Sequence, residues 1–131
     1  MKRIVVSIII GLASVTAFAQ STSEAPIQNI STDSTVVYRL FSTRNMYTFI
    51  KLNTRNGQMW QVHWGTDSKY RIENTLSDIS RVNKDEEKNG RFFLHPTTNI
   101  YNFILLDQVD GRVWQVQWST EVKERMVIPI Y

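Results

Sequence analysis

Two histidines, a run of adjacent carboxylates and an Asp-x-x-Asp-Gly turn are the residues of this 131-residue chain whose types could support catalysis or metal binding. His63 lies in the middle of a β-prone run and His95 precedes Pro96. Neither histidine has a second ligand at metal-binding spacing. Neither recurs at the equivalent position of an internal repeat, so we interpret both as structural or solvated.

The carboxylates Asp85, Glu86 and Glu87 stand between Lys84 and Lys88. Acid–base catalysis needs an acid whose pKa is raised by burial. Adjacent charges in such a stretch are normally solvated, and the chain has no readable nucleophile elbow or phosphate-binding glycine loop. We predict no catalytic residue.

The turn Asp107-x-x-Asp110-Gly111 has some likeness to a calcium loop. A calcium loop, however, needs alternating oxygen ligands and a distal bidentate Glu. The repeat has Asn53 and Asn56 at the equivalent positions, and Asx residues that open a turn explain both copies. The chain also has no cysteine. We therefore predict no metal site, no cofactor and no disulfide.

The amino-terminal segment has the three parts of a bacterial signal peptide. Met1-Lys2-Arg3 is positively charged, residues 4–18 are mostly apolar, and Ala17-Phe18-Ala19 precedes Gln20. A transmembrane anchor is the alternative, but it needs about 20 apolar residues. We predict cleavage near Ala19–Gln20, a periplasmic or secreted location, and no transmembrane segment after processing.

Cleavage would change the charge of the chain. The precursor has 15 basic and 12 acidic residues, and the loss of Lys2 and Arg3 leaves 13 basic residues, so the formal charge falls from +3 to +1. The two signs are interspersed, whereas a nucleic-acid binder concentrates its basic residues on one face. We expect no nucleic-acid partner.

An internal repeat at an offset of 54 residues dominates the rest of the chain. Residues 47–66 align without a gap on residues 101–120, and ten of the 20 positions are identical. Such a duplication is the first feature to establish before a fold is assigned.

Each copy contains β-prone runs bounded by turn residues, which predicts four strands per copy. Pro129 suits an edge strand because it lacks a backbone donor. The expected strands are 35–41, 46–54, 58–64 and 70–76 in the first copy, and 91–94, 100–108, 112–118 and 124–130 in the second.

This organisation predicts one all-β domain over residues 35–131, preceded by a flexible polar leader over 20–34. The domain consists of repeats 35–77 and 90–131 and a charged connector, 78–89, in which a short helix around Leu76, Ile79 and Val82 is the alternative. We expect about eight strands in two tandem four-strand antiparallel meanders, related by a pseudo-twofold axis as a small sandwich or barrel.

Asn56-Gly57 and Asp110-Gly111 predict β-hairpins. A three-residue loop, or another odd length, would pair Leu52 with Trp60. It would gather the isoleucine, leucine, valine and tryptophan side chains on one face, and a one-residue slip would separate them. We therefore predict an odd loop, with all four tryptophans in the core. The alternative is that Trp64 and Trp118, which lie near strand ends, stack on a sugar or a peptide at the rim.

The odd loop leaves a mixed aromatic and amide face on the other side of each hairpin. Packing explains most aromatic residues, but clustered exposed aromatics also mark binding sites. The ligand-binding candidates on this face are Tyr47, Phe49, Gln61, His63, Tyr101, Phe103, Gln115 and Gln117.

The segment Leu106-Asp107-Gln108-Val109-Asp110-Gly111-Arg112-Val113-Trp114, with the preceding Gly90-Arg91-Phe92, resembles a pattern of many small exported bacterial proteins of unassigned function. In that pattern a Gly-Arg-Tyr/Phe strand leads to a Leu-Asp-x-x-x-Gly-x-Val-Trp hairpin. The first copy departs from it, since Asn53 replaces the Asp and no Gly-Arg pair precedes Tyr38. The resemblance implies an all-β structural unit and carries over no catalytic residue.

Together these features predict an exported, non-catalytic binding module of the cell envelope, with another envelope protein or a glycan as its partner. An envelope-acting hydrolase of unrecognised type would instead require a cleft with convergent polar groups and a shifted pKa. A structural or assembly subunit is the third possibility, and it would associate with itself.

Overall fold

The computed structural model describes residues 33–131, and these residues form an all-β protein. The predicted signal peptide, 1–19, and residues 20–32 of the predicted leader lie outside the described residues. No helix in residues 33–131 has the length and apolar character needed to cross a membrane.

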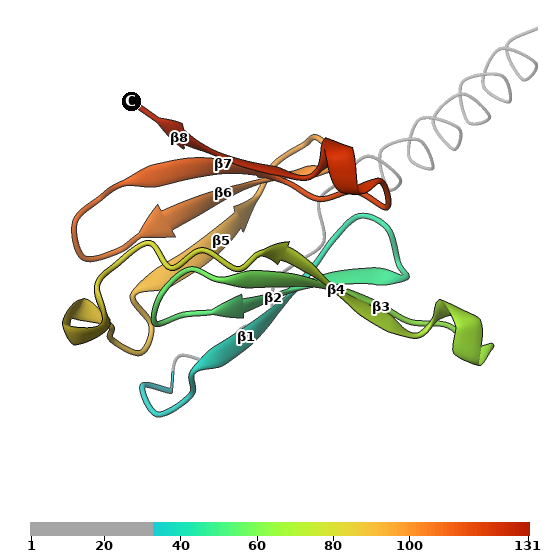
Figure 1. Ribbon diagram of the computed structural model, residues 1–131, viewed down its shortest axis with the longest axis horizontal. Coiled ribbons are helices and arrows are strands. Elements are labelled where there is room, and N and C mark those ends of the chain that lie inside the picture. Colours follow the sequence, from blue (N-terminus) through green and yellow to red (C-terminus); the bar gives the residue numbers. More distant parts are fainter. Residues whose placement is uncertain (1–32) are drawn as a thin grey trace, which may run out of the picture.

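Eight strands form two separate four-stranded antiparallel sheets, each in simple meander order. The first sheet consists of β1 (Tyr38–Ser42), β2 (Thr48–Asn53), β3 (Met59–His63) and β4 (Ile72–Ser77). The second consists of β5 (Phe92–Pro96), β6 (Asn102–Asp107), β7 (Val113–Gln117) and β8 (Met126–Ile130). Figure 1 shows the sheets as two layers that do not close into a barrel. The predicted all-β fold of two tandem meanders is therefore confirmed, in its sandwich form.

Three short 3-10 turns join these strands. The turn η1 (Ser68–Tyr70) lies between β3 and β4, and η3 (Val122–Glu124) lies at the equivalent place between β7 and β8. The connector between the sheets contains only η2 (Lys84–Glu86), so the alternative helix around Leu76 is wrong, since Leu76 belongs to β4. Pro129 lies on the edge strand β8, as its missing donor requires.

The hairpin loops have four residues, so the predicted odd loop is wrong. Asn53 N–H donates to the Gln58 carbonyl (2.9 Å), and Asp107 N–H donates to Arg112 in the same way (2.9 Å). As a result Leu52 lies opposite Met59, and Lys51 lies opposite Trp60.

Asx side chains fix this loop length. The Asn53 Oδ1 atom accepts the Arg55 N–H (2.9 Å), and the Asn56 Oδ1 atom accepts the Gln58 N–H (3.0 Å). Gly57 closes the loop at φ +82°, a conformation that glycine adopts without strain. Asp107, Asp110 and Gly111 repeat this arrangement in the second copy. The paired Asx residues are thus turn caps, as their interpretation predicted.

The two repeats bury opposite faces of their sheets. In the first repeat the inward residues of the hairpin are Ile50, Leu52, Met59 and Gln61. In the second repeat the inward residues are Phe103, Leu105, Trp114, Val116 and Trp118. These two sets do not correspond under the 54-residue offset, since the equivalent of Ile50 is Ile104, which lies on the outer face.

The predicted pseudo-twofold relation therefore does not hold. Twofold packing would bury the same face of each repeat, because the axis exchanges the two sheets. Instead, the buried face of the first repeat is not equivalent to the buried face of the second. The two sheets therefore pack front to back, as successive layers of a stack do. The predicted core of four tryptophans is confirmed for Trp114 and Trp118, which are buried. It is wrong for the first repeat, where Trp64 is 41% exposed and Trp60 is half-buried on the outer face.

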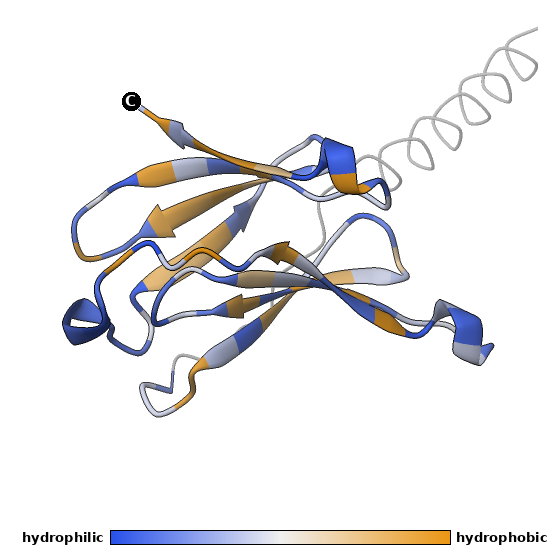
Figure 2. Cartoon of the chain, viewed as in Figure 1, coloured by the Kyte–Doolittle hydropathy of each residue, from blue (hydrophilic) through white to orange (hydrophobic). Residues whose placement is uncertain are grey.

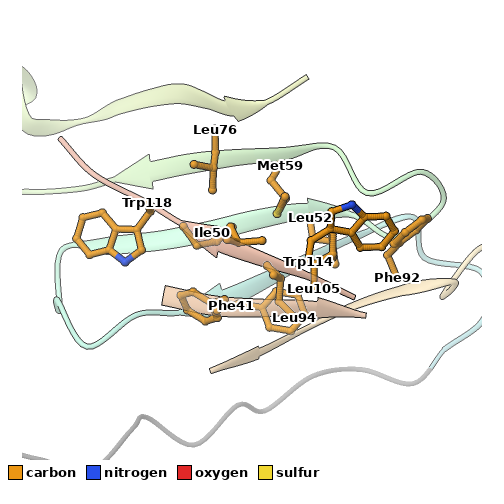
Figure 3. Close-up of a cluster of buried hydrophobic side chains, with 12 residues drawn as sticks. Phe41, Ile50, Leu52, Met59, Leu76, Phe92, Leu94, Leu105, Trp114 and Trp118 are labelled. Atoms are coloured by element: carbon orange, nitrogen blue, oxygen red, sulfur yellow. The ribbon is translucent and has the colours of Figure 1, made fainter. Parts of the chain in front are cut away.

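A single hydrophobic core fills the space between the sheets (Figure 3). The first sheet contributes mostly aliphatic side chains and the second contributes both aliphatic and aromatic ones. At the edge of this core Phe41 of β1 makes an edge contact with the partly buried Phe93 of β5 (5.1 Å between ring centroids). The cluster comprises Phe41, Ile50, Leu52, Met59, Leu76, Phe92, Leu94, Phe103, Leu105, Trp114, Val116 and Trp118.

Candidate functional site

The structure divides the eight predicted ligand-binding residues among different faces. In the first sheet, Tyr47 and Phe49 lie on the outer face and Gln61 and His63 on the inner face. In the second sheet Phe103 is in the core. Gln115 and Gln117 are on the outer face, and Tyr101 is exposed at its end. The predicted single mixed face therefore does not exist, because it depended on the odd loop.

Two of these residues, Tyr47 and His63, do come together at a pocket. The pocket has a volume of about 560 Å³ and lies at the end of the first sheet that carries η1. Figure 1 shows η1 at a tip of this sheet that extends past the second sheet. The lining residues are Asn45, Tyr47, Thr48, His63, Trp64, Gly65, Thr66, Lys69, Tyr70, Ile72, Asn74 and Thr120.

A chain of hydrogen bonds leads from the core to this pocket. The Gln61 amide forms two bonds with the Ser119 backbone, from Nε2 to the carbonyl (2.9 Å) and from the Ser119 N–H to Oε1 (3.1 Å). Gln61 Nε2 also lies 3.3 Å from His63 Nε2, and His63 Nδ1 lies 3.0 Å from Thr48 Oγ1. The fully buried Gln61 side chain thus joins the two sheets and positions His63.

This network assigns the proton of His63. The Gln61 amide nitrogen can only donate, so His63 Nε2 accepts and His63 Nδ1 carries the proton toward Thr48. Burial lowers the pKa of His63, and the nearby Arg125 charge lowers that pKa further. His63 is therefore neutral at neutral pH, and both of its nitrogens are engaged within the protein.

Aromatic rings give the pocket its apolar surface. The Tyr47 ring packs on the Trp64 indole with 5.3 Å between centroids, and the indole N–H donates to the Met46 carbonyl (2.8 Å). Tyr70 is exposed and also lines the pocket, next to Gly65. The second repeat has the same pair, Tyr101 and Trp118, but there the indole is only 2% exposed.

The polar groups of the pocket are amides, hydroxyls, one neutral imidazole and the Lys69 ammonium group. None of the lining residues is a carboxylate. Residues 33–131 also contain no group of three His, Cys, Asp or Glu side chains that could hold a metal ion. The pocket can therefore stack an apolar ring face and hydrogen-bond neutral polar groups.

The motif residues Arg91 and Asp107 lie away from the pocket, in a buried ion pair. Arg91 Nε is 2.9 Å from Asp107 Oδ1, and Arg112 Nη2 is 3.3 Å from Asp107 Oδ2. Burial raises the pKa of Asp107, but hydrogen bonds from Arg91 and from the Val109 and Asp110 backbone outweigh it and hold this pKa below its ordinary value. The Gly-Arg-Phe and Leu-Asp segments thus serve to fix the hairpin loop to β5.

Sequence reasoning missed several pocket residues, among them Asn45, Lys69, Tyr70, Asn74 and Thr120. Lys69 was visible only as a residue matched by Lys123 in the repeat. Thr120 comes from the second repeat, so only the packing of the two sheets brings it to the site. The available signal was Tyr70. Its equivalent in the second repeat is Glu124, so the repeat does not need an aromatic ring at this position for its core.

No known protein family, curated protein or solved structure matches this chain.

Proposed function

We propose that the protein is an exported, non-catalytic binding module whose pocket takes a neutral glycan of the cell envelope. The observation that carries this proposal is the open pocket lined by Tyr47, Trp64 and Tyr70 together with amide and hydroxyl groups. Aromatic rings offer a flat apolar surface with little loss of side-chain freedom on binding. Sugar rings present an apolar C–H face bordered by hydroxyl groups, which fits both kinds of lining.

The electrostatics of the pocket support a neutral ligand. Of the lining residues only Lys69 is charged, and its ammonium group lies 5.0 Å from the Tyr70 ring centroid. Without a carboxylate, the pocket has no group to pair with a cationic peptide. The predicted signal peptide supports a location where the chain would meet envelope glycans.

A hydrolase is the alternative, and the pocket supplies the cleft and the shifted His63 pKa that this alternative requires. The arrangement nevertheless argues against catalysis. A general base must direct one nitrogen at the proton it removes, whereas Gln61 and Thr48 hold both nitrogens of His63. No lining carboxylate is present to orient the imidazole or protonate a leaving group.

Titration of the exported protein with soluble oligosaccharides of N-acetylglucosamine, glucose and mannose tests the proposal, with the change in intrinsic tryptophan fluorescence as the signal. We expect Tyr47→Ala to weaken binding about tenfold, which corresponds to about 1.4 kcal/mol. Tyr101→Ala is the matched control, because Tyr101 is equally exposed and packs on the equivalent tryptophan but lies outside the pocket.

Two results would contradict the proposal. One is the absence of binding to every saccharide of the panel. The other is an equal loss of affinity in Tyr47→Ala and Tyr101→Ala, which would place the ligand elsewhere. Release of reducing sugar from a bound oligosaccharide, abolished in His63→Gln, would instead support the hydrolase.

A further inference from the structure

Because the two repeats bury opposite faces of their sheets, the outer face of each repeat resembles the inner face of the other repeat. The outer face of the first sheet, which we call the aromatic face, carries Tyr38, Leu40, Phe49, Trp60, Val62 and Trp64. The outer face of the second sheet, which we call the aliphatic face, carries Ile104, Leu106, Val113, Gln115, Ile128 and Ile130.

These six residues of the aromatic face match residues on the buried face of the second repeat. Leu40 is equivalent to the buried Leu94, and Trp60 is equivalent to the buried Trp114. The remaining matches are Tyr38 with Phe92, Phe49 with Phe103, Val62 with Val116, and Trp64 with Trp118. In the second repeat this face packs on the first sheet, and in the first repeat it has no covering sheet among residues 33–131.

The aliphatic face likewise matches the buried face of the first repeat. Ile104 is equivalent to Ile50, and Ile130 is equivalent to Leu76, both of which are core residues. The other matches are Leu106 with Leu52, Val113 with Met59, Gln115 with Gln61, and Ile128 with Asn74. Figure 2 shows the result in β6, which is hydrophobic along most of its length because both of its faces carry apolar side chains.

We propose that the aromatic face of one copy of this chain docks on the aliphatic face of a second copy, in the way the two sheets pack within one chain. The inner faces of the two sheets, which carry the equivalents of the residues on the aliphatic and aromatic faces, already form one such interface. A second copy would extend the stack with the same pairing of faces. Such a contact is head-to-tail, since it uses different surfaces on the two partners.

A polar contact of the internal interface has its counterpart at the proposed one. Within the chain, the buried Gln61 amide pairs with the Ser119 backbone. The equivalent residues are Gln115, whose side chain is exposed on the aliphatic face, and Gly65, which follows Trp64. In the stack, Gln115 of one copy pairs with the backbone of Gly65 in the next copy.

Lys51 is the main departure of the aromatic face from the buried face, since its equivalent is Leu105. Its charge is accommodated within its own copy. The Lys51 ammonium group is paired with Glu73 and lies 5.0 Å from the Trp60 ring centroid and 5.6 Å from that of Tyr38. A neutralised ion pair can be covered at a moderate cost, whereas an unpaired charge could not. The stack should therefore be weaker than the internal interface.

The experiment blocks each face separately. Leu40→Glu adds a charge to the aromatic face, and Ile130→Glu adds one to the aliphatic face. Leu40 and Ile130 are 48% and 46% exposed, so either charge stays solvated in the single chain. Neither residue lines the pocket, so either substitution can abolish stacking while glycan binding by the single chain is unchanged, whereas the stack itself would cover Trp64 and Gly65 of the pocket. The readout is the mass distribution of the exported protein by sedimentation at increasing concentration.

We expect the wild-type protein to associate beyond a dimer as its concentration rises, as a closed ring or an open filament. Each single variant should stay monomeric, because one of the two complementary faces is blocked. A mixture of the two variants should form a one-to-one dimer and nothing larger, since each supplies the face that the other lacks. As a second readout, Gln115→Ala should weaken the wild-type association.

Three results would overturn the proposal. A wild-type protein that stays monomeric at all concentrations would remove the contact. A dimer that persists in either single variant would show a twofold contact that uses other surfaces. A mixture of the two variants that remains monomeric would show that the aromatic and aliphatic faces do not pair.

Discussion

Gln61 and Gln115 occupy the same position of the repeat but have different surroundings. The Gln61 side chain is fully buried and bonded to Ser119 across the interface between the sheets, whereas Gln115 faces outward and donates to the Asn102 side chain (2.9 Å). The equivalent amides thus join the two sheets in the first repeat and form only a surface hydrogen bond in the second. This pair offers a substitution with its own internal control.

We expect Gln61→Ala to lower the free energy of unfolding by about 2–4 kcal/mol, because it leaves the Ser119 N–H and carbonyl unpaired and opens a cavity. Gln115→Ala should change that free energy by less than about 0.5 kcal/mol, as surface substitutions do. Denaturant unfolding of dilute protein measures both. Equal effects of the two substitutions would contradict the different burial of the two amides.

Asp107 is a second residue with a strong expected effect. Asp107→Asn removes the closer of the two carboxylates paired with the buried Arg91 charge, leaving Asp110 at 3.5 Å, and should cost up to about 3–5 kcal/mol. The first repeat has Asn53 and Val37 at these two positions, so Arg91→Val should restore much of the stability lost in Asp107→Asn. Unfolding of the two single variants and the double variant measures the coupling. Additive losses would show that Arg91 and Asp107 act independently.

His63 makes stability depend on pH. Its pKa in the folded protein lies below the ordinary value of 6.5, so the unfolded chain binds a proton more readily. This contribution to stability is complete above about pH 6.5 and is lost as the pH falls toward the pKa of the folded state. His63→Gln, which installs the residue of the second repeat, should remove this component. Unfolding midpoints at about pH 7.5 and pH 5 test it, and an unchanged pH dependence in His63→Gln would contradict it.

At the level of elements, the hairpin loops differ in their surroundings although their backbones agree. Gly57 and Gly111 both have φ +82°, so an alanine at either position is strained by about 1–2 kcal/mol. A Cβ atom on Gly57 would also lie 3.0 Å from Arg81 Cδ, whereas one on Gly111 would have no neighbour within 4 Å. Gly57→Ala should therefore lower the melting temperature more than Gly111→Ala. The reverse order would contradict the packing of Arg81 against this loop.

The elements also show how far the sequence could predict the structure. Local sequence patterns within each repeat were enough to predict the duplication, the eight strands and the two Asx-Gly hairpins. The pairing register of the hairpins could not be predicted in this way, because the prediction required the equivalent residues Trp60 and Trp114 to be buried together. Both faces of each hairpin are apolar, so burial could not select a loop length. The Asx residues three positions apart, Asn53 with Asn56 and Asp107 with Asp110, were the signal for a four-residue loop.

The pocket was predictable only in part, for a reason of the same kind. Tyr47 and His63 were among the candidates because their residue types and positions in the strands are local properties. Their grouping with Phe49 and Gln61 depended on the register and was wrong. Thr120 reaches the pocket only through the packing of one sheet on the other. Sequence reasoning thus found chemistry within a strand and missed contacts between repeats.

At the scale of the whole molecule, two similar sheets pack front to back. A twofold arrangement would have hidden the same face of both repeats and left two identical outer surfaces. The front-to-back arrangement instead leaves the aromatic face at one end and the aliphatic face at the other. The pocket beside η1, the different burial of equivalent residues and the proposed stacking all depend on this single relation between the sheets.

The most direct measurement of this relation uses the absence of cysteine from the chain. Four variants, each with one cysteine at Ile50, Ile104, Val62 or Val116, are prepared with Leu40→Glu so that stacking does not cover the outer faces. The rate of reaction with a thiol reagent then reports which face is buried. We predict slow labelling at positions 50 and 116 and fast labelling at positions 104 and 62, so that each pair of equivalent residues splits in opposite directions. Equal labelling of Ile50→Cys with Ile104→Cys, and of Val62→Cys with Val116→Cys, would contradict the front-to-back packing.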